Sequence, residues 1–539
     1  MNPLQKNLYE LLIEIDEICR KYNITYFLAA GGALGAIRNH GFLPWDDDLD
    51  VYITRDNWNS FRKIINKELK ENRAFICEEN TELYYNPIGR YINTESTLML
   101  KSQLLCGECC GVMIEFLIMD PMPINLEEKW QHRENMKLYT ELLSPYMVFN
   151  NRFIEENRDF NAKLYNKYYI KSLLLGKKYV LSSLKKKFTG FPDNKCKEYC
   201  MRWGKRTVIY PKELFGTGRM VNFEGRKFPI MEFAEKSFRI GYGDDWMYVP
   251  RRTEQIIHNS VMDLDTPFKV YTDMYFPLID KSQLLSAYRR SKKKTMDAAL
   301  KRSKYEKSKT KIKAELAARY IEDTYDCMYL NELLKTNNLD ELEKELEYFF
   351  SEQFSKELLD YSIIIPVSDQ FIYVAAMFLV LKGYYYKADV LVLLREKINT
   401  KVNDSILELK KIIKLCRTLS IAIYDENDKE KVSGILSNLR CYKNKLIDYS
   451  RAELWLLKRN ASSKNDFTKL VDKAQRLIET FGNDGELISF EAYGCYQLGN
   501  KELAKEKYSL AVKNTRNGFV WMEAIDLVGI NAYKTELKV

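Results

Sequence analysis

Four aspartates fall within five residues near the start of the chain, at Asp46, Asp47, Asp48 and Asp50. Apolar and aromatic residues flank them, so like charges are concentrated in a segment with a tendency to be buried. Burial of an ion without a partner costs roughly several kcal/mol. A bound divalent cation is the simplest compensation. Side chains alternate faces in an extended segment, so we expect Asp48 and Asp50 to point the same way and grip one metal together.

A glycine pair, Gly31 and Gly32, precedes this window and is followed by Arg38. The order of residues predicts a short apolar strand, a glycine turn and then a helix that carries the basic residue. Glycine lets the backbone approach a ligand closely, and the N-terminus of a helix favours an anion such as phosphate. We expect Arg38 to add a bidentate phosphate contact. The alternative for Arg38 is a charge on the helix surface.

A third acidic residue, Glu115, lies inside the apolar run 112–121. Carboxylates are seldom fully buried unless they are paired, so Glu115 is the predicted third metal ligand. Oxygen ligands of this kind favour Mg²⁺ or Mn²⁺ over zinc. The short acid-apolar-acid strand after a glycine turn is the layout of a nucleotidyltransferase-like α/β fold.

These residues also resemble the signature of a known family. Gly31-Gly32 through Arg38, followed by 41–50 with its Pro-Trp-Asp-Asp-Asp core, is similar to the LicD family. That family includes bacterial phosphocholine transferases and, more distantly, fukutin-type phosphosugar transferases. The resemblance covers about residues 1–290. Its supporting matches are 23–27, 114–120, 223–225, 228–229, 242–244 and Pro250.

Two positions depart from the family pattern. Members usually have Thr or Ser where Gly32 stands, and most have Asp where this chain has Glu115. The first change removes a hydroxyl contact to phosphate, and the second lengthens a ligand arm that carries the same charge.

The resemblance implies a metal-dependent transferase. It would move phosphocholine, or a related phospho-substituent, from a CDP-alcohol donor such as CDP-choline to a hydroxyl of a cell-surface glycan or of its lipid-linked precursor. Asp48, Asp50 and Glu115 would hold Mg²⁺ or Mn²⁺. The alternatives are a nucleotidyltransferase acting on a small molecule or protein, and a non-catalytic scaffold.

Four further residues have candidate roles in this site. Asp46 and Asp47 would bind a second metal or act as a base on the acceptor hydroxyl, with turn capping as the alternative for Asp46. The Arg90 guanidinium is a secondary phosphate contact. Trp45 either packs in the core or offers a cation–π face to a quaternary ammonium such as choline.

At 539 residues the chain is too long for one ordinary core. We expect a catalytic α/β domain at 1–285 with a helical insertion at about 126–200. A basic linker at 286–315 then leads to an all-α domain at 316–539. In that last part Ala376, Gly383 and Ala388 recur in spacing as Ala492, Gly499 and Ala504, which resembles degenerate tetratricopeptide-type repeats. An ordinary helical bundle is the alternative. Repeats of this kind favour a protein partner or self-association.

The composition is ordinary for a globular protein, but the net charge of +9 is unevenly spread. Lysines concentrate between 167 and 187, and 289–313 forms a second basic stretch. These are either solvated surfaces or contacts to anionic lipid headgroups. No recognition motif for nucleic acid accompanies them. With no signal-peptide pattern and no apolar run long enough to span a bilayer, we expect a cytoplasmic protein, with peripheral contact at the inner face of the membrane as a further option.

Overall fold

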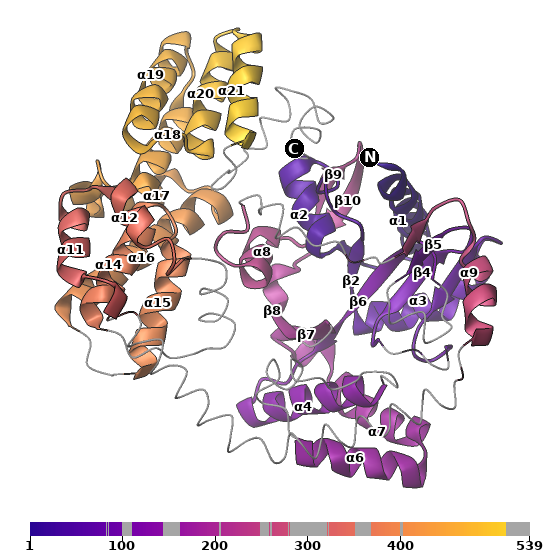
Figure 1. The fold of residues 1–539 in the computed structure, drawn as a ribbon. Helices are drawn as coiled ribbons and strands as arrows, with labels where there is room; N and C mark the ends of the chain where they lie inside the picture. Colours follow the sequence, from indigo (N-terminus) through magenta and orange to yellow (C-terminus); the bar gives the residue numbers. More distant parts are fainter. Residues whose placement is uncertain are drawn as a thin grey trace. The chain divides into compact units, whose positions relative to one another are not determined.

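The chain forms two compact units in the computed structural model (Figure 1), and each is described by itself. The first comprises Met1–Gly243, Pro250–Leu300 and Ile530–Val539, and the second Asp244–Val249 and Lys301–Gly529. The expected linker at 286–315 lies outside the described residues, so that boundary stays a prediction. The structure describes residues 1–81, 84, 86–99, 110–143, 162–203, 206–247, 258, 261–278, 280, 321, 323–350, 368–398 and 403–513.

A mixed sheet forms the centre of the first unit. Its main path runs β1-β2-β6-β4-β3, and β7 and β8 extend it from β6. The neighbours β2 and β6 are parallel, whereas the other pairs are antiparallel. The strands are β1 (Phe27–Leu28), β2 (Asp50–Thr54), β3 (Arg73–Ile76), β4 (Gly89–Asn93), β6 (Met113–Pro121), β7 (Glu198–Trp203) and β8 (Arg206–Pro211). Two smaller sheets pair β9 (Arg219–Phe223) with β10 (Arg226–Ile230), and β5 (Thr97–Met99) with β11 (Val261–Asp263).

One face of this sheet is an apolar core covered by two helices. The helix α1 (Pro3–Lys21) begins with a capping box of Asn2 and Gln5, and its leucine and isoleucine face packs against β4, β6 and α3 (Arg55–Glu68). On α3, Trp58 and Phe61 lie against Phe116 of β6. Because successive strand residues alternate faces, Glu115 points to the opposite face of the sheet.

The remaining helices of the first unit are shorter or lie in the region of the expected insertion. The helix α2 (Ala30–Asn39) follows β1 and leads towards the acidic window, and α8 (Ala234–Tyr242) follows β10. The helices that the structure describes between residues 126 and 200 are α4 (Leu126–Leu143), α6 (Ala162–Leu175) and α7 (Lys177–Thr189), and their status as an insertion stays a prediction. The helix α9 (Phe268–Tyr275) comes last, and short 3₁₀ turns lie at Asp193–Lys195, Lys212–Leu214 and Phe276–Leu278.

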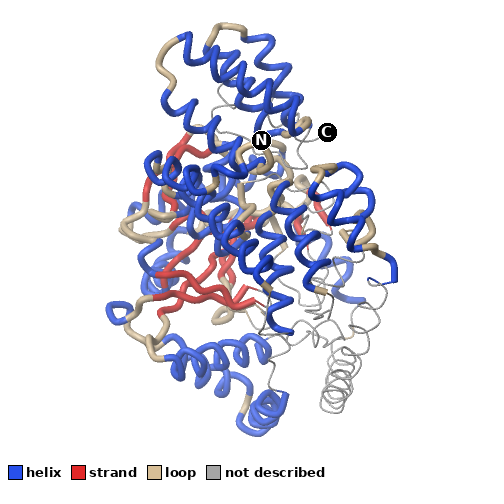
Figure 2. Tube along the Cα trace, turned by 90° about the vertical axis from the view of Figure 1, so that its left-hand side faces the viewer, coloured by secondary structure: helices blue, strands red, loops and turns tan. Residues whose placement is uncertain are grey.

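The second unit is helical throughout the part that the structure describes. Figure 2 shows helices in blue and strands in red, and the strands that the structure describes all belong to the first unit. The helices are α11 (Cys327–Lys335), α12 (Leu339–Glu345), α14 (Asp369–Leu381), α15 (Tyr385–Ile398), α16 (Asp404–Ser420), α17 (Lys429–Asn438), α18 (Ile447–Asn460), α19 (Lys464–Phe481), α20 (Gly485–Gln497) and α21 (Lys501–Lys513). A π-helical turn at Ile421–Asp425 extends α16, and a 3₁₀ turn lies at Arg440–Tyr442. The predicted order of an α/β part followed by an all-α part is therefore confirmed, while the nucleotidyltransferase-like topology stays a prediction.

The small residues of the recurring pattern lie at close helix contacts. Gly383 and Gly499 have positive φ angles of 82° and 92° in the tight turns α14–α15 and α20–α21. Both helix pairs pack together, and the flanking Ala388 and Ala504 are fully buried. The helix-turn-helix pairs expected from this spacing are present, but their membership of the tetratricopeptide class stays a prediction. None of the helices described here is both long and apolar enough to traverse a bilayer.

Candidate active site

The acidic window is a loop that enters β2, and residues from distant elements hold it. The backbone N–H of Asp46 donates to the carbonyl of Leu43 at 3.0 Å. The Gln5 side chain of α1 donates to the carbonyls of both Leu43 and Asp46, at 3.1 and 3.2 Å. These bonds fix the loop as it passes from the end of α2 to the sheet.

The turn between β9 and β10 supports the same loop from another direction. Glu224 accepts a hydrogen bond from the backbone N–H of Phe42 at 3.0 Å and donates its own N–H to the carbonyl of His40 at 2.8 Å. His40 has a left-handed backbone, with φ 49°, where α2 ends. The segment 223–225, a supporting match in the sequence, therefore holds the start of the window in place.

Asp50, Glu115 and Arg90 form one row across the sheet. Asp50 of β2 is the register partner of Glu115 of β6, which is in turn the partner of Arg90 of β4. These three residues therefore share the face opposite the α1–α3 core. Arg90 donates through Nε and Nη2 to Glu115 Oε1, both at 2.8 Å. The Arg90 guanidinium therefore orients the predicted third ligand, and its predicted contact with phosphate stays a prediction.

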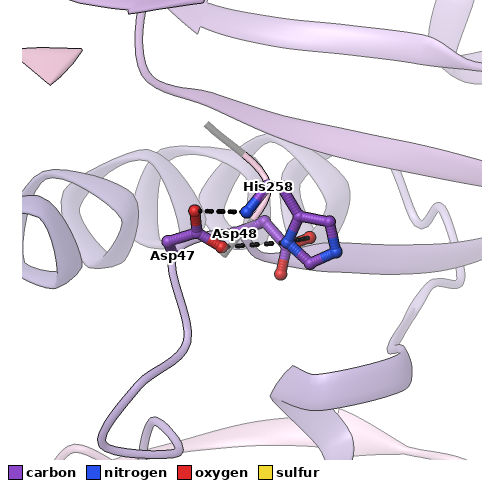
Figure 3. A group of neighbouring side chains, drawn as sticks. All are labelled: Asp47, Asp48 and His258. Atoms are coloured by element: carbon purple, nitrogen blue, oxygen red, sulfur yellow. Dashed lines mark hydrogen bonds and ion pairs between the residues drawn. The ribbon is translucent and has the colours of Figure 1, made fainter. Parts of the chain in front are cut away.

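A histidine from the far end of the unit meets the middle of the window (Figure 3). The Nδ1 atom of His258 lies 2.9 Å from Asp47 Oδ1 and 3.3 Å from Asp48 Oδ2. The backbone N–H of His258 donates to Asp47 Oδ2 at 2.9 Å. Among the described residues, these three form a group whose ligand atoms all lie within 4.8 Å of one another. Within the described residues, the ligand atoms of the predicted trio Asp48, Asp50 and Glu115 do not all lie within 4.8 Å of one another.

Buried, closely spaced carboxyl groups dominate the electrostatics of the window. Burial is the main cause of the raised pKa values of Asp46 and Asp50, and neighbouring carboxylates raise both further. Burial also raises the pKa of Asp48 to about 6. The pKa of His258 rises to about 9, chiefly through its hydrogen bond to Asp47. His258 is therefore a cation at neutral pH and partly offsets the carboxylates.

Two carboxylate oxygens in the window have no hydrogen-bond partner. Asp46 Oδ2 and Asp50 Oδ1 are both buried and unsatisfied, in residues that are only 8% and 4% exposed. A buried oxygen without a partner is costly, and several in one place are the environment that a hard cation satisfies. The second acidic group, Cys77, Glu78 and Glu79, differs because Lys185 pairs with both of its carboxylates. The window is thus the better fit for a divalent metal.

The glycine pair lies in a different element from the one expected. Gly31 and Gly32 form the first turn of α2, which begins at Ala30, and not a turn before the helix. A Cβ atom on Gly31 would overlap the Asp46 carboxylate, and one on Gly32 would overlap the Leu49 side chain. The expected glycine turn is therefore wrong. Asp46 and Leu49 pack closely against the first turn of α2, which explains why glycine, with no Cβ atom, occupies both positions.

The other predicted residues lie at the edge of this arrangement. Arg38 is in the last turn of α2, at the opposite end of the helix from the glycines, and is 3% exposed. Trp45 is half-buried in the turn before Asp46. The phosphate contact of Arg38 and the packing or cation–π role of Trp45 stay predictions.

Sequence reasoning assigned no role to His258 and did not place Tyr242 near the acids. Burial raises the pKa of the Tyr242 hydroxyl, and Asp46 and Asp50 are the next largest causes. The hydroxyl is therefore neutral and within electrostatic reach of both carboxylates. The family match at 242–244 was the available signal for Tyr242, whereas His258 stands 211 residues from Asp47 in sequence.

Comparison with known proteins finds similarity to one family in the part of the chain that forms this site. Residues 23–97 match LicD, described as "LicD/FKTN/FKRP, nucleotidyltransferase domain". The chain is similar to the lipopolysaccharide cholinephosphotransferase LicD of Haemophilus influenzae, with 26% identity over 253 residues, which cover 45% of this chain and 89% of that relative.

Two uncharacterized Rickettsia proteins match shorter segments. The one from Rickettsia typhi is 35% identical over 80 residues, covering 14% of this chain and 26% of that relative. The one from Rickettsia prowazekii is 37% identical over 59 residues, covering 11% and 22% respectively. The chain spans about a quarter of the length of these two relatives. The segment that matches the family model contains α2, the acidic window and β2, so the similarity to the LicD family falls on the part of the first unit that forms the candidate site.

Proposed function

We propose that this protein is a metal-dependent phosphotransferase. It moves phosphocholine, or a related phospho-substituent, from a CDP-linked donor to a hydroxyl of a cell-surface glycan or of its lipid-linked precursor. The observation that carries the proposal is the pair of unpartnered, buried oxygens of Asp46 and Asp50, beside the start of α2 in the segment that is similar to the LicD family. The cholinephosphotransferase relative supports the nature of the transferred group.

The carboxylates of the window and Glu115 suit Mg²⁺ or Mn²⁺. Asp48, Asp50 and Glu115 are our proposed ligands, and because their ligand atoms do not all lie within 4.8 Å of one another here, the ion would have to draw them together. A bound cation would neutralise charge on the donor phosphates and on the leaving nucleotide. His258 would have to lose its proton before it could bind a metal, because a histidine ligand is neutral. Its hydrogen bonds to Asp47 orient the loop instead. Arg90 fixes one oxygen of Glu115 and so sets the direction of that carboxylate.

Groups of the chain itself would accept the proton of the acceptor hydroxyl and bind the phosphates of the donor. The acceptor oxygen forms a bond to the phosphorus of the transferred group, and the bond from that phosphorus to the CMP oxygen breaks. Asp46 is our candidate for taking the hydroxyl proton, because its Oδ2 has no hydrogen-bond partner and burial raises the pKa of its carboxyl, which makes it a stronger base. The backbone N–H groups that open α2 favour the negative charge of the donor phosphates.

Incubation of the full chain with Mg²⁺ and a panel of CDP-alcohols tests the function. We expect release of CMP with CDP-choline, or with CDP-ethanolamine, CDP-ribitol or CDP-glycerol, and loss of that release on chelation of the metal. Release of pyrophosphate from nucleoside triphosphates, without CMP release, would support a nucleotidyltransferase. Neither product with any donor, in the presence of glycan acceptors, would favour the scaffold alternative.

Replacement of Gly31 by alanine is expected to reduce CMP release about a hundredfold, because displacing Asp46 by about 1 Å disturbs the reacting geometry. Gly434→Ala is the matched control, since a Cβ there meets nothing within 4 Å and also lies in a helix, α17. Alanine favours a helix over glycine by about 1 kcal/mol, so both variants should keep or gain thermal stability. Equal turnover in the two variants would show that Asp46 does not need this close approach.

A further inference from the structure

The hairpin of α6 and α7 has an unusual charge for its length. Residues 162–189 contain eight lysines and no aspartate, glutamate or arginine. Gly176, with φ 86°, connects the two helices, and Figure 1 shows them next to α4. The segment therefore carries positive charge only, with no acidic residue of its own to balance its lysines.

One face of the hairpin is packed into the protein. Val180, Leu184 and Phe188 of α7 recur at intervals of four residues and are buried, together with Tyr165 of α6. They share a core cluster with the α4 residues Met136, Leu138, Tyr139, Leu142 and Leu143. The hairpin is thus packed on the first unit through one face, and its other face forms an outer surface.

The outer surface ends in a group of exposed apolar side chains that we call the leucine tip. Its members are Ile170, Leu173, Leu174, Leu175 and Tyr179, which are 47%, 59%, 77%, 58% and 65% exposed. The first three share one helix face by their spacing of three and four residues. Leu175 directly precedes Gly176, and Tyr179 follows it by three residues. Contiguous apolar side chains of this size on a surface mark a site of interaction.

The charge around the leucine tip indicates its partner. Lys171 and Lys178 are exposed beside the tip, and Lys186 is exposed further along α7. Lys185, by contrast, is committed to ion pairs with Glu78 and Glu79. Leucine and tyrosine surrounded by lysine suit the interface of an anionic bilayer, where apolar side chains enter the headgroup region and lysines meet lipid phosphates. A free phosphate would use the lysines and leave the leucines exposed.

We propose that the leucine tip docks the first unit onto an anionic membrane surface, with Leu173 and Leu174 inserted and Lys171 and Lys178 paired with lipid headgroups. This docking needs neither donor nor acceptor, so it stands apart from the proposed reaction. It would hold the enzyme where a lipid-linked acceptor resides.

Vesicle sedimentation with the full chain tests this surface. One set of vesicles is phosphatidylcholine alone, and the other is an equal mixture of phosphatidylcholine and phosphatidylglycerol. We expect sedimentation with the mixed vesicles only, and a decrease as salt is raised. In the double variant Leu173→Glu/Leu174→Glu the partition coefficient should fall about tenfold or more, since charged groups replace inserted apolar ones.

Two further variants separate the explanations. Lys171→Gln/Lys178→Gln should weaken binding to the mixed vesicles about thirtyfold without touching the core, because each of the two lysines near such a surface contributes about 1 kcal/mol. Leu407→Glu, at a leucine of α16 that is 43% exposed, is the control and should bind as the wild type does.

Three results would overturn the proposal. In the first, the wild-type chain does not sediment with the mixed vesicles. In the second, it sediments equally with both vesicle types. In the third, the leucine and lysine variants bind the mixed vesicles as the wild type does. A wild-type dimer in light scattering that becomes monomeric in Leu173→Glu/Leu174→Glu, with no vesicle binding, would assign the tip to self-association instead. CMP release measured on the same samples shows separately whether the proposed reaction holds.

Discussion

Asp50→Asn should abolish transfer while the chain stays folded. Asp50 is buried at the start of β2, paired in register with Glu115, and its Oδ1 has no partner. An asparagine keeps the shape but removes the charge that a divalent cation requires. A cation contributes several kcal/mol of charge stabilisation, so we expect turnover to fall roughly a thousandfold or more.

The same variant should be no less stable than the wild type when metal is absent. Burial is the largest cause of the raised pKa of Asp50, and Asp48, Glu115 and Asp46 raise it further, so the charge of Asp50 is disfavoured in the folded state. Loss of that charge relieves repulsion, so the melting temperature without metal should stay equal or rise. Mg²⁺ should raise the melting temperature of the wild type and leave that of Asp50→Asn unchanged, because a ligand stabilises only a state that binds it.

Two measurements check this expectation: CMP release, and thermal unfolding with and without Mg²⁺. Asp56→Asn is the matched control, since Asp56 is an exposed carboxylate in the first turn of α3. It should keep both turnover and the metal-dependent shift. Turnover by Asp50→Asn close to that of the wild type would remove Asp50 from the metal site. A preserved Mg²⁺ shift with lost turnover would place the cation elsewhere in the window.

The sequence was informative about the site where the relevant pattern is local. An acidic residue within an apolar run is visible in one dimension, and Glu115 does lie beside Asp50 in the parallel pair of β2 and β6. The spacing around Gly383 and Gly499 likewise marks tight turns, because positive φ at a glycine is a local property.

The sequence was uninformative where contacts join distant segments. The residues near Asp47 do not predict its contact with His258, which is 211 residues away in the sequence. The residues near Phe42 likewise do not predict the hydrogen bond from its N–H to Glu224. The role of Arg90 also depended on register, since only the pairing of β4 with β6 puts its guanidinium on Glu115. The first turn of α2 was mistaken for a glycine turn because glycine is a poor helix former. Here close packing against Asp46 overrides that preference.

Removal of a single arginine should disrupt the second unit. Arg451 of α18 is 3% exposed and contacts three carboxylates. They are Asp448 at 3.0 Å, Asp484 at 2.6 Å and Glu486 at 3.2 Å. The carboxylate of Asp484 also caps α20 by accepting the N–H of Leu487, so Arg451 ties two helices together. Arg451→Met would leave three buried carboxylates without this cation, and it should lower the free energy of unfolding by about 3–5 kcal/mol.

The pH dependence of unfolding gives an independent check on the same cluster. Burial raises the pKa of Asp448 to about 6 and that of Glu486 to about 7, and Arg451 opposes both shifts. The folded state therefore holds these protons more tightly than the unfolded state does. Their contribution to stability is fully present below the ordinary carboxyl pKa of about 4 and is lost as pH rises through 6 and 7. Without the arginine the loss should be steeper.

Urea unfolding followed by circular dichroism at pH 5 and pH 8 measures both effects. We expect the second unit of the wild type to be less stable at pH 8, and Arg451→Met to lose most of its stability there. Glu486→Gln should flatten the wild-type dependence, because it removes the group with the higher pKa. Arg459→Met, at an exposed position of the same helix, controls for the loss of a cation and should follow the wild type. If Arg451→Met unfolds as the wild type does at both pH values, the three carboxylates must find other partners, and the arginine does not hold α18 to α20.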